Sequence, residues 1–291
     1  MAQDDPNGRR IGMARMPGIL YGTAWKQEQT AALVQRALER GFRGIDTACQ
    51  PKHYDEAGVG RGIAAALGNG LTRADLYLQT KFTPLPGQDP RRIPYDPEAP
   101  LSEQVEQSFQ VSLRNLGTDH LDGLLLHSPL ATIGQTLEAW KTFEKLHLSG
   151  GVRRLGISNC YDPRLLEHLT LNARVKPTVV QNRFYAQTRY DREIRAFCRR
   201  QGIVYQSFWT LTANPHLLAH PALTSRAERL GCTPEQLFFR LLTRLDITPL
   251  TGTTSVQHME EDLAIFAIEL DEASRVELER ALFGEPIHGS H

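Results

Sequence analysis

The chain has few cysteines and no excess charge of either sign. Lys and Arg together number 33, as do Asp and Glu, so the formal net charge is zero. This balance gives no support to binding of nucleic acid or of an anionic membrane. The cysteines are far apart and form no CxxC pair, which argues against a zinc site and favours a reduced, cytoplasmic setting. They are Cys49, Cys160, Cys198 and Cys232.

Long apolar runs are also missing. No stretch approaches the roughly 18 apolar residues of a membrane span. The N-terminus is polar and lacks the apolar centre of a secretory signal. We therefore expect residues 1–9 to be a flexible leader and residues 10–291 to form one soluble domain. Hydrophobic residues make up 41% of the sequence, which is enough for a large core.

Eight short apolar runs recur along the chain, separated by longer amphipathic stretches. Each run is nearly continuous in apolar character, as expected of a parallel strand buried on both faces. Eight alternations of strand and helix predict an α/β fold of the (β/α)8, or TIM, barrel type, and fit it better than an open doubly wound sheet. The runs are 18–22, 44–47, 76–81, 121–127, 154–158, 178–181, 203–208 and 247–251.

Helix start and stop residues lie between these runs. Ser102 and Asp162 are the expected N-caps of two helices, and glycines follow three of the helical patterns. The four clearest helices are predicted at 28–40, 102–116, 163–171 and 192–201. Two long loops, 82–100 and 210–221, leave the C-terminal ends of strands, where barrels build active sites.

Polar side chains end several of the predicted strands. Taken singly, Asp46 is explained as a helix cap, Lys81 as a solvated strand end and His127 as a hydrogen-bonded core histidine. Together, however, an acid, a lysine and a histidine end three consecutive strands, and Tyr54 follows the first of them. Because the C-terminal ends of barrel strands meet at one mouth, these residues are predicted to share a site there.

The chain resembles the aldo-keto reductase superfamily over roughly residues 16–282. Residues 41–48 (GFRGIDTA), Tyr54, Glu56 and the pair at 59–60 are similar to its GxRxxDTA…Y…E…VG signature. Lys81, His127, the GISN of residues 156–159 and the QN of residues 181–182 match later landmarks in order. The resemblance implies a barrel with an N-terminal β-hairpin and a catalytic tetrad of Asp46, Tyr54, Lys81 and His127.

The resemblance also implies a reaction, reduction of an aldehyde or ketone to an alcohol. Tyr54 would donate the proton, although an unperturbed phenol has a pKa near 10. Lys81 would lower that pKa, and Asp46 would hold Lys81 charged and in place. His127 would donate a hydrogen bond to the carbonyl oxygen. Relatives that reduce carbon–carbon double bonds carry glutamate at the His127 position, so carbonyl reduction is favoured.

The cofactor implied by the resemblance is NADPH. Ser158, Asn159 and Gln181 would bind the nicotinamide carboxamide, and Phe208 would stack on the ring. The other implied cofactor contacts are Gly22, Thr23, Ala24, Asp46, Trp209, Leu211, Thr253, Thr254, His258, Glu261 and Asp262. His258 stands where the family has the arginine that grips the 2′-phosphate, and Asp262 where it has asparagine. A histidine is charged only part of the time near neutrality, so NADH is a possible cofactor too.

The expected partner is a small carbonyl compound, contacted by Trp25, Tyr54, His127 and Trp209. The two indoles favour an apolar or ring-bearing substrate, and packing of both in the core is the alternative. We expect no metal ion, no nucleic acid or membrane partner, and a monomer or dimer. Two other functions are considered: a cofactor-binding regulatory or scaffold protein of the same fold with little turnover, and an unrelated barrel enzyme such as a lyase or metal-dependent hydrolase. The intact tetrad opposes the first, and the absence of metal-ligand spacing opposes the second.

Overall fold

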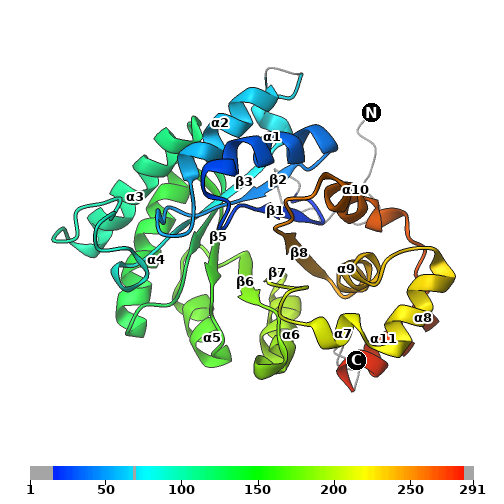
Figure 1. Cartoon of the computed structure of the whole chain (residues 1–291). Helices are drawn as coiled ribbons and strands as arrows, with labels where there is room; N and C mark the ends of the chain where they lie inside the picture. Colours follow the sequence, from blue (N-terminus) through cyan, green and yellow to red (C-terminus); the bar gives the residue numbers. More distant parts are fainter. Residues whose placement is uncertain (1–15, 68–69, 285–291) are drawn as a thin grey trace.

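Eight parallel strands close into a barrel in the computed structural model, which describes residues 16–67 and 70–284. Each strand pairs with the next along the chain, and β8 pairs with β1. Figure 1 shows the strands in the centre with helices around them. The strands are β1 (Leu20–Gly22), β2 (Gly44–Asp46), β3 (Tyr77–Phe82), β4 (Leu121–Leu126), β5 (Val152–Ser158), β6 (Val179–Arg183), β7 (Val204–Phe208) and β8 (Ile247–Thr251).

A helix follows each strand. In the described part of the chain, two further α-helices lie between β7 and β8, and one more follows the helix after β8. The helices are α1 (Thr30–Arg40), α2 (Glu56–Leu67), α3 (Leu101–Leu116), α4 (Ile133–Leu148), α5 (Pro163–Asn172), α6 (Arg192–Gln201), α7 (Pro215–Leu218), α8 (Pro221–Leu230), α9 (Pro234–Arg244), α10 (Val256–Ala264) and α11 (Glu272–Phe283). The (β/α)8 barrel predicted from the sequence is therefore confirmed, with all eight strands at the predicted places.

Most local helix signals act as predicted. The left-handed glycines Gly41, Gly117 and Gly202 end α1, α3 and α6, and Asp162 caps α5 by accepting from the Arg164 N–H. The prediction for Ser102 is wrong. Helix α3 begins one residue earlier, at Leu101, with Pro100 in the cap position. Ser102 therefore lies inside the first turn, where it cannot cap the helix.

The two long loops contain short ordered segments. The 82–100 segment begins inside β3 and includes a turn of 3-10 helix at Leu85–Gly87, and the 210–221 segment includes α7. The predicted leader, and residues 10–15 ahead of β1, where the predicted N-terminal hairpin would lie, are outside the described residues. Among the described helices, none is both long and apolar enough to cross a membrane.

Strand alternation divides the buried apolar side chains into two groups. One group comes from the strands and from Met16, four residues ahead of β1: Met16, Leu20, Tyr77, Leu125, Val179, Val204 and Leu250. The other includes the alternate strand positions, such as Leu78, Val180 and Tyr205, together with residues of the helices. Since successive side chains of a strand point to opposite faces, the first group fills the barrel and the second lies between barrel and helices.

Helices α2 and α3 approach each other closely at Gly60. A Cβ built on Gly60 would lie 2.0 Å from the backbone oxygen of Asn115. We predict that Gly60→Ala destabilises the protein by about 1–3 kcal/mol, because the helix backbones must move apart. Gly134→Ala is the control, since its Cβ would have Thr132 Oγ1 as nearest neighbour at 3.8 Å. Chemical unfolding measures both, and equal stabilities of the two variants would contradict the prediction.

Candidate active site

The barrel interior changes from apolar to polar along the strands. Tyr77, Val179 and Val204 belong to the apolar group inside the barrel. Two residues further along the same strands lie Gln79, Gln181 and Gln206, which are all buried. Two residues further again come Lys81, Arg183 and Phe208, at the C-terminal ends of the strands. Polar side chains therefore gather at the C-terminal mouth, as the sequence predicts.

A buried ion pair joins the ends of β2 and β3. Lys81 Nζ lies 2.6 Å from Asp46 Oδ2 and donates a second hydrogen bond to the Thr47 carbonyl at 2.9 Å. Lys81 is 1% exposed and Asp46 is 3% exposed. An ammonium group has three donors, so one is left for a neighbour at the mouth. The pair shows why a charged lysine is tolerated at a buried strand end.

Three glutamines complete the environment of Asp46, and the sequence analysis did not identify two of them. Gln79 Nε2 and Gln181 Nε2 donate to Asp46 Oδ1 at 2.7 and 2.9 Å. Both also donate to Gln206 Oε1, at 2.9 Å each. Gln79 Oε1 in turn accepts from the Tyr77 hydroxyl at 2.8 Å. In the sequence, these residues are recognisable as glutamines that stand at inward-facing positions of the strands β3, β6 and β7.

Tyr54 and His127 lie next to this ion pair and are both partly exposed. Lys81 Nζ is 5.5 Å from the centroid of the Tyr54 ring. The Tyr54 and His127 rings meet edge to face, with centroids 6.0 Å apart. The structure thus brings the four predicted tetrad residues together, with the charged pair beneath and the two rings accessible above it.

The pKa of Tyr54 differs in direction from the one expected at the sequence level. Burial, and then the charge of Asp46, raise the pKa of the Tyr54 phenol well above its usual value. These two effects outweigh the lowering expected from Lys81, whose ammonium is paired with Asp46. Burial also lowers the pKa of Lys81, although Asp46 opposes that shift. Tyr54 therefore keeps its proton over the physiological pH range.

His127 is held by two neighbours. Its Nδ1 lies 2.6 Å from Thr83 Oγ1, and its backbone carbonyl accepts from Asn159 Nδ2 at 2.8 Å. Burial, followed by the charges of Lys81 and His53, lowers the pKa of His127 well below 6.5. When Thr83 donates to Nδ1 of the neutral ring, the ring proton is on Nε2, free to donate a hydrogen bond. Thr83, which the sequence analysis did not single out, is therefore a positioning residue for His127.

The residues expected to bind the nicotinamide lie at the ends of β5, β6 and β7. Ser158 and Gln181 are buried and paired in the strand register, and Phe208 is partly exposed at the end of β7. Asn159 has a left-handed backbone (φ 52°), and its N–H donates to the Gln181 carbonyl at 3.1 Å. The Ser158 hydroxyl donates to no described residue, and Gln181 Oε1 accepts from none.

Most of the remaining expected cofactor residues lie beside β1 and β8, whereas Trp209 and Leu211 follow β7. Gly22 ends β1 and Thr23 follows it, and Thr253 lies in the segment that leads into α10, where Ser255 accepts from the His258 N–H. Lys26, which the sequence analysis missed, donates from Nζ to the Gly252 carbonyl at 2.7 Å. It is 6% exposed, and burial lowers its pKa to about 8. Its signal in the sequence is a lone cation directly after the first strand.

Trp25 and Trp209 flank the mouth after β1 and β7. They are 59% and 48% exposed, which excludes the alternative that both are core residues. The Trp25 ring stacks on His53, with centroids 3.9 Å apart, and Trp209 stacks on Arg183. Both tryptophans have left-handed backbones, with φ of 63° and 54°. Such conformations are unfavourable for bulky residues and are concentrated at functional sites.

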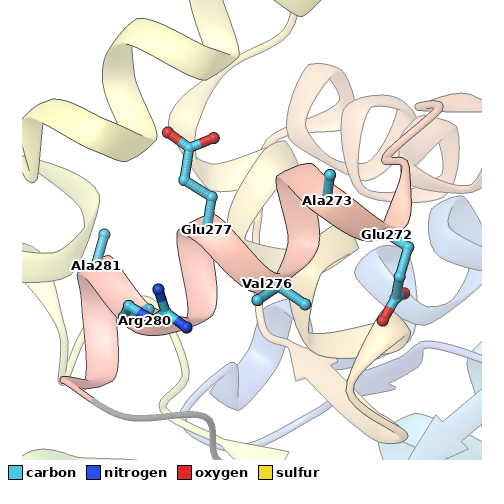
Figure 2. Close-up of a pocket in the computed structure, with 6 residues that line it drawn as sticks. All are labelled: Glu272, Ala273, Val276, Glu277, Arg280 and Ala281. Carbon is cyan, nitrogen blue, oxygen red and sulfur yellow. The ribbon is translucent and has the colours of Figure 1, made fainter.

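Other features of the described residues lie elsewhere. No three His, Cys, Asp or Glu side chains in this part of the chain are grouped as metal ligands. Cys49 is buried, and burial raises the pKa of its thiol, which fits a packed, inert cysteine. A recess beside α11, drawn in Figure 2, is lined by residues of that helix alone and lies in the outer helical layer, away from the mouth.

The Asp46–Lys81 pair gives a prediction about stability. Asp46→Asn leaves a buried ammonium without a counter-ion and is expected to cost about 3–5 kcal/mol. Lys81→Met added to Asp46→Asn removes the unpaired charge, so the double variant should be more stable than the sum of the single costs predicts. Urea unfolding of the four proteins completes the cycle. Additive costs would show that the two groups do not interact.

The lowered pKa of His127 gives a second prediction, on pH. The folded state binds this proton more weakly than the unfolded state, so the contribution to stability is present above about pH 6.5 and is lost as the pH falls below it. Wild type should therefore lose more stability between pH 7.5 and pH 5 than His127→Gln, as measured by unfolding at each pH. His168→Gln, an exposed substitution on α5, is the control. Parallel curves for wild type and His127→Gln would contradict the prediction.

Comparisons with known proteins agree with this geometry. A family model described as the aldo/keto reductase family matches residues 11–282. An uncharacterised oxidoreductase of Bacillus subtilis (strain 168) is 30% identical over 248 residues, covering 84% of this chain and 81% of the relative. A glyoxal reductase of the same strain is 29% identical, covering 82% and 78%. The crystal structure of an aldo/keto reductase from Brucella melitensis is similar with a TM-score of 0.77 and 28% identity, over 92% of this chain and 95% of that one. The closed barrel and the arrangement of the tetrad agree with these matches. Because the family model covers nearly the whole chain, the chain belongs to the aldo/keto reductase family.

Proposed function

We propose that the protein reduces an aldehyde or ketone to an alcohol, with hydride from a nicotinamide cofactor and the proton from Tyr54. The observation that carries this proposal is the arrangement of Tyr54 and His127, partly exposed and edge to face, above the buried Lys81–Asp46 pair. A carbonyl oxygen placed between the two rings would meet one acidic hydroxyl and one ring N–H. The relative named glyoxal reductase supports the same class of reaction.

The residues at the ends of β5 and β6 fit a carboxamide. A carboxamide has an NH₂ donor and a carbonyl acceptor. Ser158 has a hydroxyl that donates to no described residue, and Gln181 has an Oε1 that accepts from none, although its Nε2 is held by Asp46 and Gln206. Phe208 lies at the end of the next strand, paired in register with Arg183. These groups are the ones we propose to hold the nicotinamide.

The β1 and β8 side fits the phosphates of the same cofactor. Lys26 supplies a cation beside Gly252, and the N-terminus of α10 supplies backbone donors near Thr253 and Thr254. The 2′-phosphate would be met by His258 in place of a permanently charged arginine. Asp262 is buried nearby, and burial raises its pKa to about 6. An ionised Asp262 would repel a 2′-phosphate, so we propose NADPH as the cofactor with NADH also accepted.

The chain's own residues would act on the carbonyl oxygen. The bound nicotinamide supplies the hydride to the carbonyl carbon. As negative charge develops on the oxygen, Tyr54 transfers its proton to it, and His127 stabilises it by a hydrogen bond from Nε2. Lys81 lies beside the phenol, and its remaining N–H is available to the phenolate that forms. Asp46 keeps the lysine in place, and Gln79 and Gln181 donate hydrogen bonds to Asp46, while Gln206 accepts from both glutamines.

Removal of the Tyr54 hydroxyl tests this proposal. Tyr54→Phe should lower kcat about 100- to 10,000-fold, as expected for loss of a general acid, while the affinity for NADPH stays close to that of wild type. Turnover is measured by NADPH absorbance on a panel of aldehydes and ketones that includes glyoxal, and cofactor affinity by fluorescence titration with NADPH and NADH.

The matched control is Tyr190→Phe. Tyr190 lies in the segment between β6 and α6, and its hydroxyl contacts His216 of α7. This variant should leave kcat unchanged. Undiminished turnover in Tyr54→Phe would refute the role of the phenol. Failure of wild type to bind either cofactor would refute the proposed reaction as a whole.

A further inference from the structure

Arg183 at the C-terminal end of β6 has no counter-ion in the described part of the chain. Its guanidinium carbon lies 4.1 Å from the centroid of the Trp209 ring and 4.7 Å from that of Tyr185. Stacking of this kind engages the face of the guanidinium and leaves its N–H groups unused. Nε is buried without a hydrogen-bond partner, and no described carboxylate lies within 4.0 Å of the guanidinium. A cation is thus held against two aromatic rings, with the N–H of Nε left without a hydrogen-bond partner.

The position of Arg183 on its strand puts it at the proposed site. Val179 points into the barrel, so alternation places Gln181 and Arg183 on the same inward face. Two residues of a strand span about 6.6 Å, which puts Arg183 one step nearer the mouth than Gln181. Gln181 in turn donates to Asp46. Arg183 is therefore close to the tetrad, on the solvent side of the residues proposed to hold the nicotinamide.

A continuous series of contacts joins Arg183 to His127. The Arg183 backbone N–H donates to the Tyr161 hydroxyl at 3.1 Å, and that hydroxyl donates to Asn159 Oδ1 at 3.2 Å. Asn159 Nδ2 donates to the His127 carbonyl at 2.8 Å. Arg183 and His127 therefore lie on the same rim of the mouth, and the His127 ring is the one that would contact the carbonyl oxygen.

The aromatic neighbours of Arg183 are held at some cost. Trp209 has a left-handed backbone (φ 54°), a conformation that is unfavourable for a bulky residue. The ring is nonetheless half exposed rather than packed in the core, and it covers one face of the guanidinium. Such stacking orients the planar fork of Arg183 for two parallel hydrogen bonds to a carboxylate.

We propose that Arg183 is a specificity-determining residue that binds a carboxylate carried by the carbonyl substrate, so that the preferred substrates are oxo-acids in which the carboxylate is separated from the carbonyl by a short chain. This inference rests on the proposed reduction of a carbonyl group. It differs from the expectation of an apolar or ring-bearing substrate contacted by both indoles, because the Trp209 indole is stacked on a cation. The apolar chain of such a substrate would lie between its carbonyl group, held by Tyr54 and His127, and its carboxylate, held by Arg183.

The test compares two aldehydes of similar size, succinic semialdehyde and butanal, with NADPH as cofactor. Wild type should prefer the acid in kcat/KM. In Arg183→Gln the ratio of kcat/KM for the acid to that for butanal should fall about 10- to 100-fold, mainly through KM, as expected for loss of a charge-assisted hydrogen bond. Arg189→Gln is the control, because Arg189 is an exposed arginine of the following segment that pairs with Glu193. It should leave the ratio unchanged.

Equal losses for both aldehydes, or no preference for the acid in wild type, would overturn the inference. A weakened affinity for NADPH in Arg183→Gln, with the aldehyde ratio unchanged, would overturn it too and assign Arg183 to the cofactor phosphates. A binding measurement separates these results from failure of the proposed reaction. Succinate should change the tryptophan fluorescence of wild type with NADP⁺ present, whereas neutral succinamide and Arg183→Gln should give no such change. If neither aldehyde is reduced, the proposed reaction fails, and the succinate titration alone decides whether Arg183 binds a carboxylate.

Discussion

The ammonium group of Lys81 is buried at the mouth of the barrel, where Asp46 and the Thr47 carbonyl are its polar partners. Asp46 opposes the effect of burial, which lowers the pKa of Lys81. Removing a charge from water costs several kcal/mol even after relaxation, so a buried lysine needs a carboxylate in contact and further polar partners. Asp46 provides the contact at 2.6 Å. Its second oxygen is occupied by the amides of Gln79 and Gln181, and both of these reach Gln206 across the barrel. One ion pair therefore accounts for polar side chains on four strands.

This arrangement separates the charged groups from the groups that a substrate can reach. Lys81 and Asp46 are almost fully buried, whereas Tyr54 and His127 are partly exposed above them. Burial raises the pKa of the phenol and lowers that of the imidazole, so both rings are neutral near pH 7. Two neutral hydrogen-bond donors facing one point suit an oxygen that gains negative charge during a reaction.

Three of the left-handed non-glycine backbone conformations among the described residues lie where the site is expected. Trp25, Asn159 and Trp209 all have positive φ, and each directly follows the end of a strand or lies within three residues of it. Each such conformation is unfavourable and persists only because the surroundings hold it. The contacts that do so are visible: the Trp25 N–H donates to the His53 carbonyl, Asn159 bridges to His127, and Trp209 stacks on Arg183. The rim of the mouth is thus a set of turns that present side chains rather than a continuation of the strands.

The sequence by itself determined the barrel and the four residues at its centre. Strands buried on both faces are read from their apolar runs, and polar residues at the ends of successive parallel strands must converge, so Asp46, Lys81 and His127 could be grouped without coordinates. The family resemblance then implied that Tyr54, in the segment after the first of these strands, completes the tetrad. The cap of α3 was misplaced because Ser102 has the right chemistry but lies two residues after the cap position, which Pro100 occupies. Only the tertiary structure decided the features that depend on contacts between distant strands. These are the glutamines that surround Asp46, the direction of the Tyr54 pKa, the exposure of both tryptophans and the arginine stacked beneath one of them. A side chain's type is a local property, but its partners, its burial and its unsatisfied hydrogen bonds are set by segments far away in the chain.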